Sequence, residues 1–148
     1  MTRLSTRFQR AEDSPGFMLW KAANRLQRLH AGVLSDLAVT PTQCSLLTCL
    51  VYLQQVEGGA VTATRIVEHS GMDKMSVSDL LKSLERKKLL RRRAHPEDGR
   101  ARLIEVTTAG ERITNAAVTR IEALDTEFFA RVKNAASFHE DLLSLAGG

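Results

Sequence analysis

The chain has 148 residues, of which 43% are hydrophobic, and this composition is ordinary for one compact domain with a single core. Charge interrupts its apolar runs well short of the ~20 residues that a membrane helix needs, and no charged-then-apolar leader opens it, so we expect a cytoplasmic protein without a membrane partner. The formal net charge of +4 is too small to indicate a nucleic-acid partner by itself.

The polar side chains form no pattern typical of catalysis or metal binding. Cys44 and Cys49 are the two cysteines, and five residues apart on one predicted helix they point about 140° apart, which disfavours a disulfide. The histidines do not stand at ligand spacings such as HExxH, so we predict no metal site. Because the sequence also lacks a glycine-flanked serine and a phosphate loop, we expect neither an enzyme nor a cofactor.

A flexible arm and a long helix are predicted at the start of the chain. Residues 1–13 are polar and lack a clear period, whereas Ser14 and Pro15 are typical of a helix N-cap and of its first residue. Apolar residues then recur at helical spacing and predict an amphipathic helix to about Asp36. They are Leu19, Ala22, Ala23, Leu26, Leu29, Val33 and Leu37. An apolar stripe of this length needs another surface to cover it.

A second, buried helix is predicted to follow. Thr40 and Gln43 form a capping box, and the run 44–53 is apolar on almost every side, which is typical of a central helix. Cys44 lies on its apolar face, and this favours a small buried side chain over a redox switch. After a glycine turn, residues 60–61 are candidates for a very short strand.

Two short helices joined by a glycine-containing turn come next, and they predict a helix-turn-helix. Thr62 caps the first helix, Gly71 ends it, and Asp73 caps the second. The second helix has an inward stripe at Val77, Leu80, Leu81 and Leu84. The remaining face is typical either of a solvated helix or of a recognition helix, whose hydroxyls and cations reach bases and phosphates. It carries Lys74, Met75, Ser76, Ser78, Asp79, Lys82 and Arg86.

A basic β-hairpin is predicted beyond these helices and decides between the two interpretations. Residues 89–94 and 102–106 favour extended chain, and the segment 95–99 between them contains proline and Asp-Gly. Cations gather over the helix and the hairpin at Lys82, Arg86, Lys87, Lys88, Arg91, Arg92, Arg93, Arg100 and Arg102. A compact basic patch suits the regular phosphate spacing of DNA. Arg100 at the tip could enter a minor groove, and Asp98 either orients it or only forms the turn.

Two further helices are predicted at the end of the chain. Thr108 and Glu111 form a capping box, and an apolar stripe at steps of three and four follows to about Asn134. Ser137 and Glu140 form another box before a short apolar helix. A winged lobe is too small to cover both stripes, so they need a partner chain.

Several of these segments resemble the MarR family of bacterial regulators. They are residues 72–78, 84–85, 95–102 and 106–110. The resemblance also covers residues 40–43 and the order of the elements, so it spans nearly the whole chain except the N-terminal arm. The Asp-x-Arg of the wing, followed by the Thr-x-x-Gly that opens the next helix, is a specific signature. The chain departs from the family pattern at Lys88, where glycine is usual, and at Asp79, where a basic residue is common. These departures bear on the helix C-cap and on the base sequence that is read.

The resemblance implies a mainly α-helical (α+β) fold, with a winged helix-turn-helix lobe at about 40–107 and dimerisation helices at about 15–37 and 108–146. Residues 14–148 would then form one domain behind the arm. The implied function is that of a sequence-specific regulator of transcription, usually a repressor, that binds an inverted-repeat operator in double-stranded DNA as a homodimer. A small aromatic ligand is the candidate effector, and cysteine oxidation is the family's other means of relief. A winged helix used for protein contact is the rival interpretation, and the basic wing argues against it.

Site residues follow from this interpretation. The predicted DNA-binding residues are Thr64, Lys74, Ser76, Ser78, Lys82, Arg86, Asp98, Arg100 and Arg102. Trp20 and His30 are candidates for an effector site because they lie on the first helix, next to the cleft where the family binds ligands. Simple packing is the alternative for Trp20, and a hydrogen-bonded core or interface position is the alternative for His30.

Overall fold

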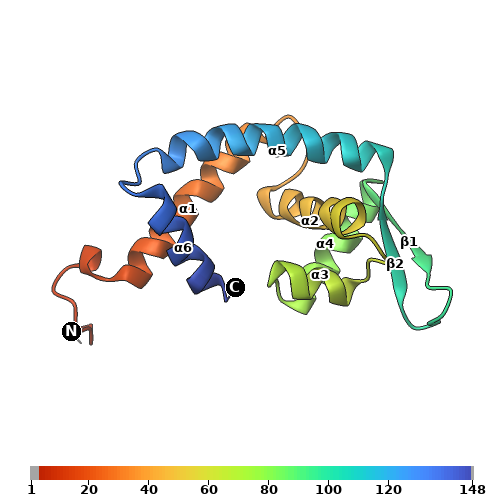
Figure 1. The fold of residues 1–148 in the computed structure, drawn as a ribbon, viewed down its shortest axis with the longest axis horizontal. Coiled ribbons are helices and arrows are strands. Elements are labelled where there is room, and N and C mark those ends of the chain that lie inside the picture. The colour runs from red at the N-terminus through yellow and green to blue at the C-terminus, as the bar shows by residue number, and fades with distance from the viewer. Residues whose placement is uncertain (1–3, 148) are drawn as a thin grey trace.

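The computed structural model describes residues 4–147 and confirms a mainly helical fold with one β-hairpin (Figure 1). The first helices are the 3₁₀ turn η1 (Ala11–Asp13), α1 (Pro15–Val33), α2 (Pro41–Tyr52) and the π-helical turn η2 (Leu53–Glu57). Next come α3 (Ala63–Ser70), α4 (Lys74–Arg86), β1 (Leu90–Ala94) and β2 (Arg102–Val106). The chain ends with α5 (Thr108–Phe129) and α6 (Ala135–Ala146). The predicted arm begins at residues 1–3, which lie outside the described range.

Short polar side chains start the helices of the lobe where the sequence predicts. The Thr40 hydroxyl accepts a hydrogen bond from the Gln43 amide at 3.1 Å, and the Gln43 side chain accepts from the Thr40 amide at 3.1 Å. Thr62 caps α3, and Asp73 caps α4 by accepting from the Ser76 amide at 2.8 Å. Each cap satisfies an amide that the first turn of a helix leaves without a partner.

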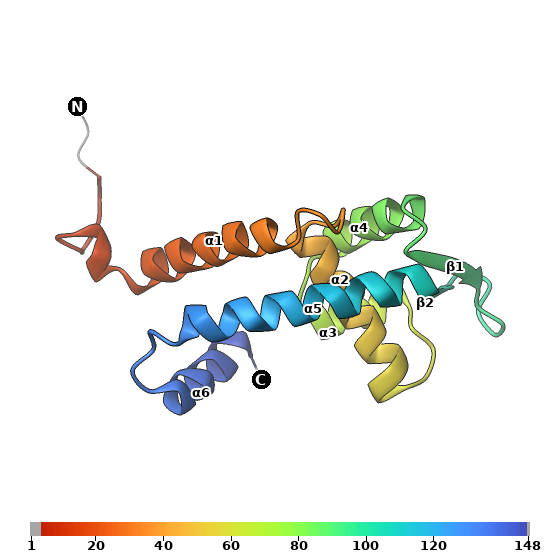
Figure 2. The ribbon, with the colours of Figure 1, turned by 90° about the horizontal axis from the view of Figure 1, so that it is seen from above.

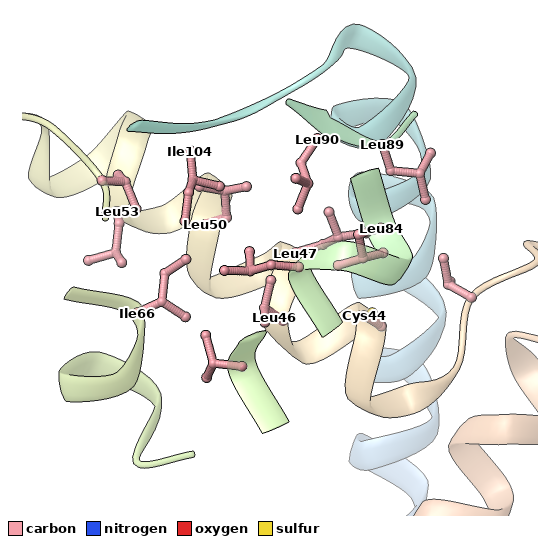
Figure 3. Packing of buried hydrophobic residues seen from close by; sticks show 14 of the residues in the cluster. Cys44, Leu46, Leu47, Leu50, Leu53, Ile66, Leu84, Leu89, Leu90 and Ile104 are labelled. Atoms are coloured by element: carbon pink, nitrogen blue, oxygen red, sulfur yellow. The ribbon is translucent and has the colours of Figure 1, made fainter. Parts of the chain in front are cut away.

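The core of the lobe surrounds α2. Leu46, Leu47 and Leu50 of α2 are completely buried and lie among side chains from α3, α4 and both strands (Figure 3). Cys44 is 2% exposed and belongs to the same cluster, which confirms its prediction as a small buried side chain. Burial against elements on several sides explains why this helix is apolar on almost every face.

The hairpin that forms the wing pairs Leu90 with Val106 at its base and Ala94 with Arg102 near its tip. The strand predicted at residues 60–61 is wrong, since this segment has no regular secondary structure. Val61 is nevertheless buried, and its carbonyl accepts one hydrogen bond from the Ile104 amide at 2.9 Å. A single bond anchors the segment to β2 but is too little for a ladder.

The ends of the outer helices differ from their predictions. Helix α1 stops at Val33 rather than near Asp36, because Arg120 of α5 donates to the Val33 carbonyl at 3.1 Å and also pairs with Asp36. The Leu37 amide, which would continue the helix by bonding to Val33, bonds to the Leu34 carbonyl instead. The turn places Leu34 in the core.

Helices α5 and α6 are capped one and three residues earlier than predicted. Thr107 rather than Thr108 caps α5, and Asn134 rather than Ser137 caps α6. Helix α5 also ends at Phe129, five residues before the predicted Asn134. The apolar period continues past Phe129 although the helix does not, because Phe138 of α6 folds back to lie 5.9 Å from the Phe129 ring.

The start of α5 is fixed to the chain that leaves α4. A Cβ atom on Gly110 would lie 2.0 Å from the Leu89 carbonyl oxygen and 2.7 Å from Cγ2 of Val106, so this close approach requires glycine. The Thr107 amide donates to the same Leu89 carbonyl at 3.0 Å, and its hydroxyl donates to the Lys88 carbonyl at 2.8 Å. Helix α5 then runs from the lobe to the outer helices, beside α1 (Figure 2).

Candidate nucleic-acid interface

Helix α4 presents a mixed polar face to solvent beside the wing. Val77, Leu81 and Leu84 are buried, which confirms three of the four residues of the predicted inward stripe, and Leu80 is half-buried. Ser78 is also half-buried. The other predicted outward residues are exposed, namely Lys74, Met75, Ser76, Asp79, Lys82 and Arg86. Thr64, on the first turn of α3, is exposed as well.

The first turn of α4 is ordered by Asp73. In addition to the amide, the Ser76 hydroxyl donates to the Asp73 carboxylate, at 2.5 Å. The Ser76 hydroxyl and amide hold the pKa of Asp73 below its usual range. Because its proton is given to Asp73, the Ser76 hydroxyl faces outward as an acceptor.

The last turn of α4 ends without glycine, as the departure at Lys88 predicts. Lys88 has a φ of 58°, in the left-handed region. Its amide bonds to the Glu85 carbonyl at 2.9 Å, and the Leu89 amide bonds to the Leu84 carbonyl at 3.0 Å. These two bonds form a Schellman motif, and the buried Leu84 and Leu89 supply its apolar contact. The strain at Lys88 is thus held by neighbours on both sides.

Lys87 is exposed, but its ammonium is bonded to groups at the start of α2, which the sequence did not indicate. Its ammonium donates to the Ala38 carbonyl at 2.6 Å and to Oε1 of Gln43 at 2.9 Å. The buried Gln43 amide donates in turn to the Ser83 hydroxyl at 2.9 Å. Lys87 and Gln43 are 44 positions apart in the sequence, so no local pattern could reveal their hydrogen bond. Lys87 therefore leaves the basic patch and fixes α4 against the start of α2.

Three arginines of the wing are paired within the lobe. Arg91 and Arg93 both bond to Oε2 of Glu105, at 2.8 and 2.7 Å, and Arg92 bonds to Glu85 at 2.5 and 2.8 Å. Arg91 holds the pKa of Glu105 below its usual range, with help from Arg93, and Arg92 does the same for Glu85. The pairing depends on strand register, because Arg91 stands directly opposite Glu105.

The remaining cations of this face make no ion pair within residues 4–147. They are Lys74, Lys82, Arg86, Lys88, Arg100 and Arg102, and all are exposed. The Asp98 carboxylate accepts from the backbone amide of Arg100 at 2.9 Å, so it fixes the chain at the wing tip and not the guanidinium. Exposed cations thus run from the start of α4 to the wing tip, a pattern suited to a phosphate backbone.

Asp79 lies on this face without a neutralising partner. Among the described residues no cation stands within 4.0 Å of its carboxylate, although Lys82 and Arg86 are on the same helix. It borders a polar hollow between α4 and the start of α2, together with Thr40, Ser76 and Ser83. The acid is therefore free to accept a hydrogen bond from a ligand in front of α4.

The two candidate effector residues do not come together. Trp20 is 63% exposed and stacks on Phe17 at a ring distance of 5.8 Å. His30 is largely buried, and its Nε2 lies 2.7 Å from a carboxylate oxygen of Asp125 on α5. Ten residues of one helix separate them by about 15 Å. One small ligand therefore cannot reach both within a single chain.

An apolar hollow of about 370 Å³ opens between α1, α5 and α6. Its lining includes Leu19, Leu26, Phe128, Phe129, Phe138 and Leu142, but neither Trp20 nor His30. Exposed apolar side chains on α1 and α6 continue beyond its rim, namely Phe17, Met18, Leu143 and Leu145. No residue of α1 or α6 is buried within the described chain, so these helices present an apolar surface without a cover.

Neither the two cysteines nor the acidic and histidine side chains of the described residues form a further site. Burial raises the pKa of both Cys44 and Cys49, so neither thiol is activated, and both are free. In the part of the chain that the structure describes, no three His, Cys, Asp or Glu side chains gather to hold a metal ion. Its helices are also too short or too polar to cross a membrane.

Known proteins are similar to this chain in sequence and in fold. Residues 39–101 match the sequence profile of the MarR family. Over 140 residues, the chain is 31% identical to YdcH of Bacillus subtilis, an uncharacterized HTH-type transcriptional regulator, and the match covers 95% of each protein.

Two solved structures have a similar fold. The MepR–DNA complex of S. aureus has a TM-score of 0.80 at 20% identity, over 93% of this chain and 98% of that one. CouR of Rhodococcus jostii RHA1, bound to p-coumaroyl-CoA, has a TM-score of 0.78 at 23% identity, over 94% and 96% of the two chains. The sequence profile, the near full-length relative and the winged lobe lead to one assignment. The chain belongs to the MarR family of DNA-binding transcription regulators.

Proposed function

We propose that this protein is a repressor that binds an inverted-repeat operator as a homodimer and is released by a small aromatic ligand. The observation that carries the proposal is the row of exposed cations from Lys74, at the start of α4, to Arg100 at the wing tip. Helix α4 would occupy the major groove, and the wing tip would enter the adjacent minor groove.

The predicted site residues fall into those proposed to contact base edges and those proposed to contact the DNA backbone. Ser76, Ser78 and Lys82 are proposed to face base edges, since none of them belongs to the buried stripe of α4. The proposed phosphate contacts are Thr64, Lys74, Arg86 and Arg102. Asp98 would hold the tip in shape while Arg100 enters the minor groove. Asp79 is suited to accept a hydrogen bond from a cytosine amino group.

The homodimer is supported by the uncovered apolar surface of α1, α5 and α6. A two-fold partner would bury this surface and set two α4 helices about 34 Å apart, which is one turn of DNA. Trp20 is the one tryptophan of the chain and lies on this surface, so its fluorescence reports on assembly. Its emission should move to shorter wavelength as the protein is concentrated from the monomer. An emission maximum that is constant while light scattering shows a dimer would place Trp20 outside the interface.

Selection of bound duplexes from a random DNA pool tests the operator directly. We expect enriched sequences with two inverted half-sites whose centres are about 10 base pairs apart. The affinity of the purified protein for the selected duplex should also fall steeply as salt is raised. If no sequence is enriched, and a protein partner binds α4 without salt dependence, the rival function in protein contact is correct.

Arg100→Ala tests the wing. Loss of the Arg100 charge from the minor groove should weaken binding and reduce the slope of log affinity against log salt by about 0.9 for each wing. Arg7→Ala, in the exposed segment before α1, is the matched control because it removes the same charge away from the lobe and from the apolar hollow. Equal slopes for the wild type and for Arg100→Ala would show that the wing does not touch DNA.

The effector proposal is supported by the ligand that CouR carries, and it is tested with salicylate. Calorimetry should detect binding to the dimer, and the bound form should have a lower affinity for the operator, since a ligand shifts the balance only by its differential affinity. His30→Ala and Trp20→Phe are tested separately, because the two side chains are too far apart for one site in a single chain. Binding that leaves operator affinity unchanged would refute the proposal for this class of ligand.

A further inference from the structure

Met75 is an apolar side chain in a polar setting. It is 75% exposed, and within residues 4–147 it is the one large apolar side chain that α4 exposes so strongly. Most other apolar side chains that are exposed lie on α1 and α6, where they continue the apolar hollow. Tyr52, in the lobe, stacks on His69 at a ring distance of 5.2 Å. The packing of the chain gives Met75 no comparable explanation.

Met75 lies on the exposed first turn of α4. It is the second residue of α4, between Lys74 and Ser76. The Asp73 cap fixes this turn through the Ser76 amide and hydroxyl, so the backbone that carries Met75 is held in place. In helix-turn-helix proteins, the first residues of the recognition helix are the ones that contact base edges.

The chemistry of the side chain selects its partner. A thioether on an unbranched chain makes van der Waals contacts and only weak hydrogen bonds, so it gains little from a phosphate or from a base donor. The major groove offers one apolar group, the C5 methyl of thymine. A protein partner would need a contiguous apolar patch, whereas the neighbours of Met75 are Lys74, Ser76 and Asp79.

We propose that Met75 recognises a thymine in each half-site by packing its side chain against the C5 methyl group. This inference rests on the proposed operator binding and deepens it, because it assigns one base to one residue. Met75 would contact the thymine methyl group, and the Ser76 hydroxyl would accept from the N6 amino group of the paired adenine. The first turn of α4 would thereby distinguish a T·A pair from the other base pairs.

Single replacement of each thymine by deoxyuridine in the selected duplex tests the assignment, since it removes the methyl group alone. Wild-type affinity should fall about fourfold at one position of each half-site, the effect of one methyl group returned to water. Met75→Ala removes the contact from both half-sites, so it should bind the unmodified duplex about 16-fold more weakly and lose no further affinity with deoxyuridine. Met75→Leu should keep the dependence. Val56→Ala, an exposed apolar position of the lobe away from α4, is the control and should behave as wild type.

Two results would overturn the inference. In the first, the affinity of the wild type does not change when deoxyuridine replaces any thymine. In the second, the affinity of Met75→Ala falls with deoxyuridine at the same position as much as that of the wild type does. Either result would leave an enriched inverted repeat intact, so operator binding would stand and the role of Met75 would fall. A pool without any enriched duplex would remove the proposed function and this assignment with it.

Discussion

The DNA-binding lobe and the outer helices differ in how much of their apolar surface a single chain buries. The lobe closes around α2, and its core residues come from every element between Val39 and Ile104. Helices α1 and α6 bury no residue within the described chain, and the buried residues of α5, from Gly110 to Ala117, all lie in its first half. The contrast teaches that the lobe buries its core within one chain, whereas the outer helices carry an apolar surface that one chain does not cover.

Removal of the chain after Lys133 should have the largest effect, because it should abolish the dimer while the lobe stays folded. The truncation deletes α6 and with it the Phe138 and Leu142 walls of the apolar hollow. We expect a monomer with a folded lobe, whose affinity for the inverted repeat falls about 10³-fold or more toward the non-specific level. Light scattering and titration of the operator measure the two effects. Deletion of residues 1–10 is the control and should leave the dimer intact; a stable dimer after loss of α6 would contradict the assignment.

Gly110→Ala should damage the junction between the two regions. The new Cβ would lie 2.0 Å from a backbone oxygen, so the strand connection or α5 must move, at a cost of about 3 kcal/mol in the free energy of unfolding. Denaturant unfolding measures it. Gly32→Ala, in α1, is the matched control, because nothing lies within 4 Å of its new Cβ and alanine favours the helix by up to about 1 kcal/mol. Equal stability of the two variants would show that Gly110 is not required.

Lys88→Gly should stabilise the lobe without affecting the outer helices. The left-handed conformation costs a lysine about 1–2 kcal/mol, and part of this is offset by the greater freedom of glycine in the unfolded chain, so we expect a gain of up to about 1 kcal/mol. Thermal unfolding of the lobe checks it. Lys87→Gly should be destabilising, because Lys87 has a φ of −76° and bonds to Gln43. A loss of stability in Lys88→Gly would mean that the strain is not relieved.

The smallest expected effect concerns the pH dependence of the wing. The pKa of Glu105 is lowered in the folded state by Arg91 and Arg93, so its contribution to stability is complete above the unfolded value of about 4.3 and is lost as pH falls through the folded pKa. The difference in melting temperature between wild type and Glu105→Gln should therefore shrink from pH 6 to pH 3. Glu105 and its two arginine partners are all partly exposed to solvent, which keeps the effect small. A difference that grows on acidification would have the wrong sign for this ion pair.

Most of the fold could be predicted because its signals are local. Caps at Thr40, Thr62 and Asp73 and the glycine at 71 place the helices of the lobe to within a residue or two. The errors occur where two local signals compete and a distant contact decides. Thr107 and Thr108 are both good caps, and the bond from the Thr107 amide to Leu89 selects the first. Asn134 prevails over Ser137 in the same way, once α6 folds back onto Phe129.

The candidate site was less predictable than the fold because surface charges pair across the structure. A cluster of cations is visible in the sequence, but whether each is free depends on strand register, which gives Glu105 two arginines, and on packing, which brings Lys87 to Gln43. Met75 belongs to the predicted outward face of α4 but not to the predicted site residues, because its exposure becomes significant only beside the polar residues of that face. Trp20 and His30 share a helix but not a site, which counting turns along α1 could have shown.

The close contact of Gly110 with Leu89 couples the orientation of α5 to that of α4. Helix α5 has 22 residues and is about 33 Å long, and its first turn is fixed to the segment that leaves α4, so the two helices tilt together. A rotation of about 6° at the outer end would move α4 by about 3 Å, close to one base-pair step of the roughly 34 Å that separates half-sites. In the proposed dimer, a displacement too small to disturb the core of the lobe would thus shift the two α4 helices out of register with the operator.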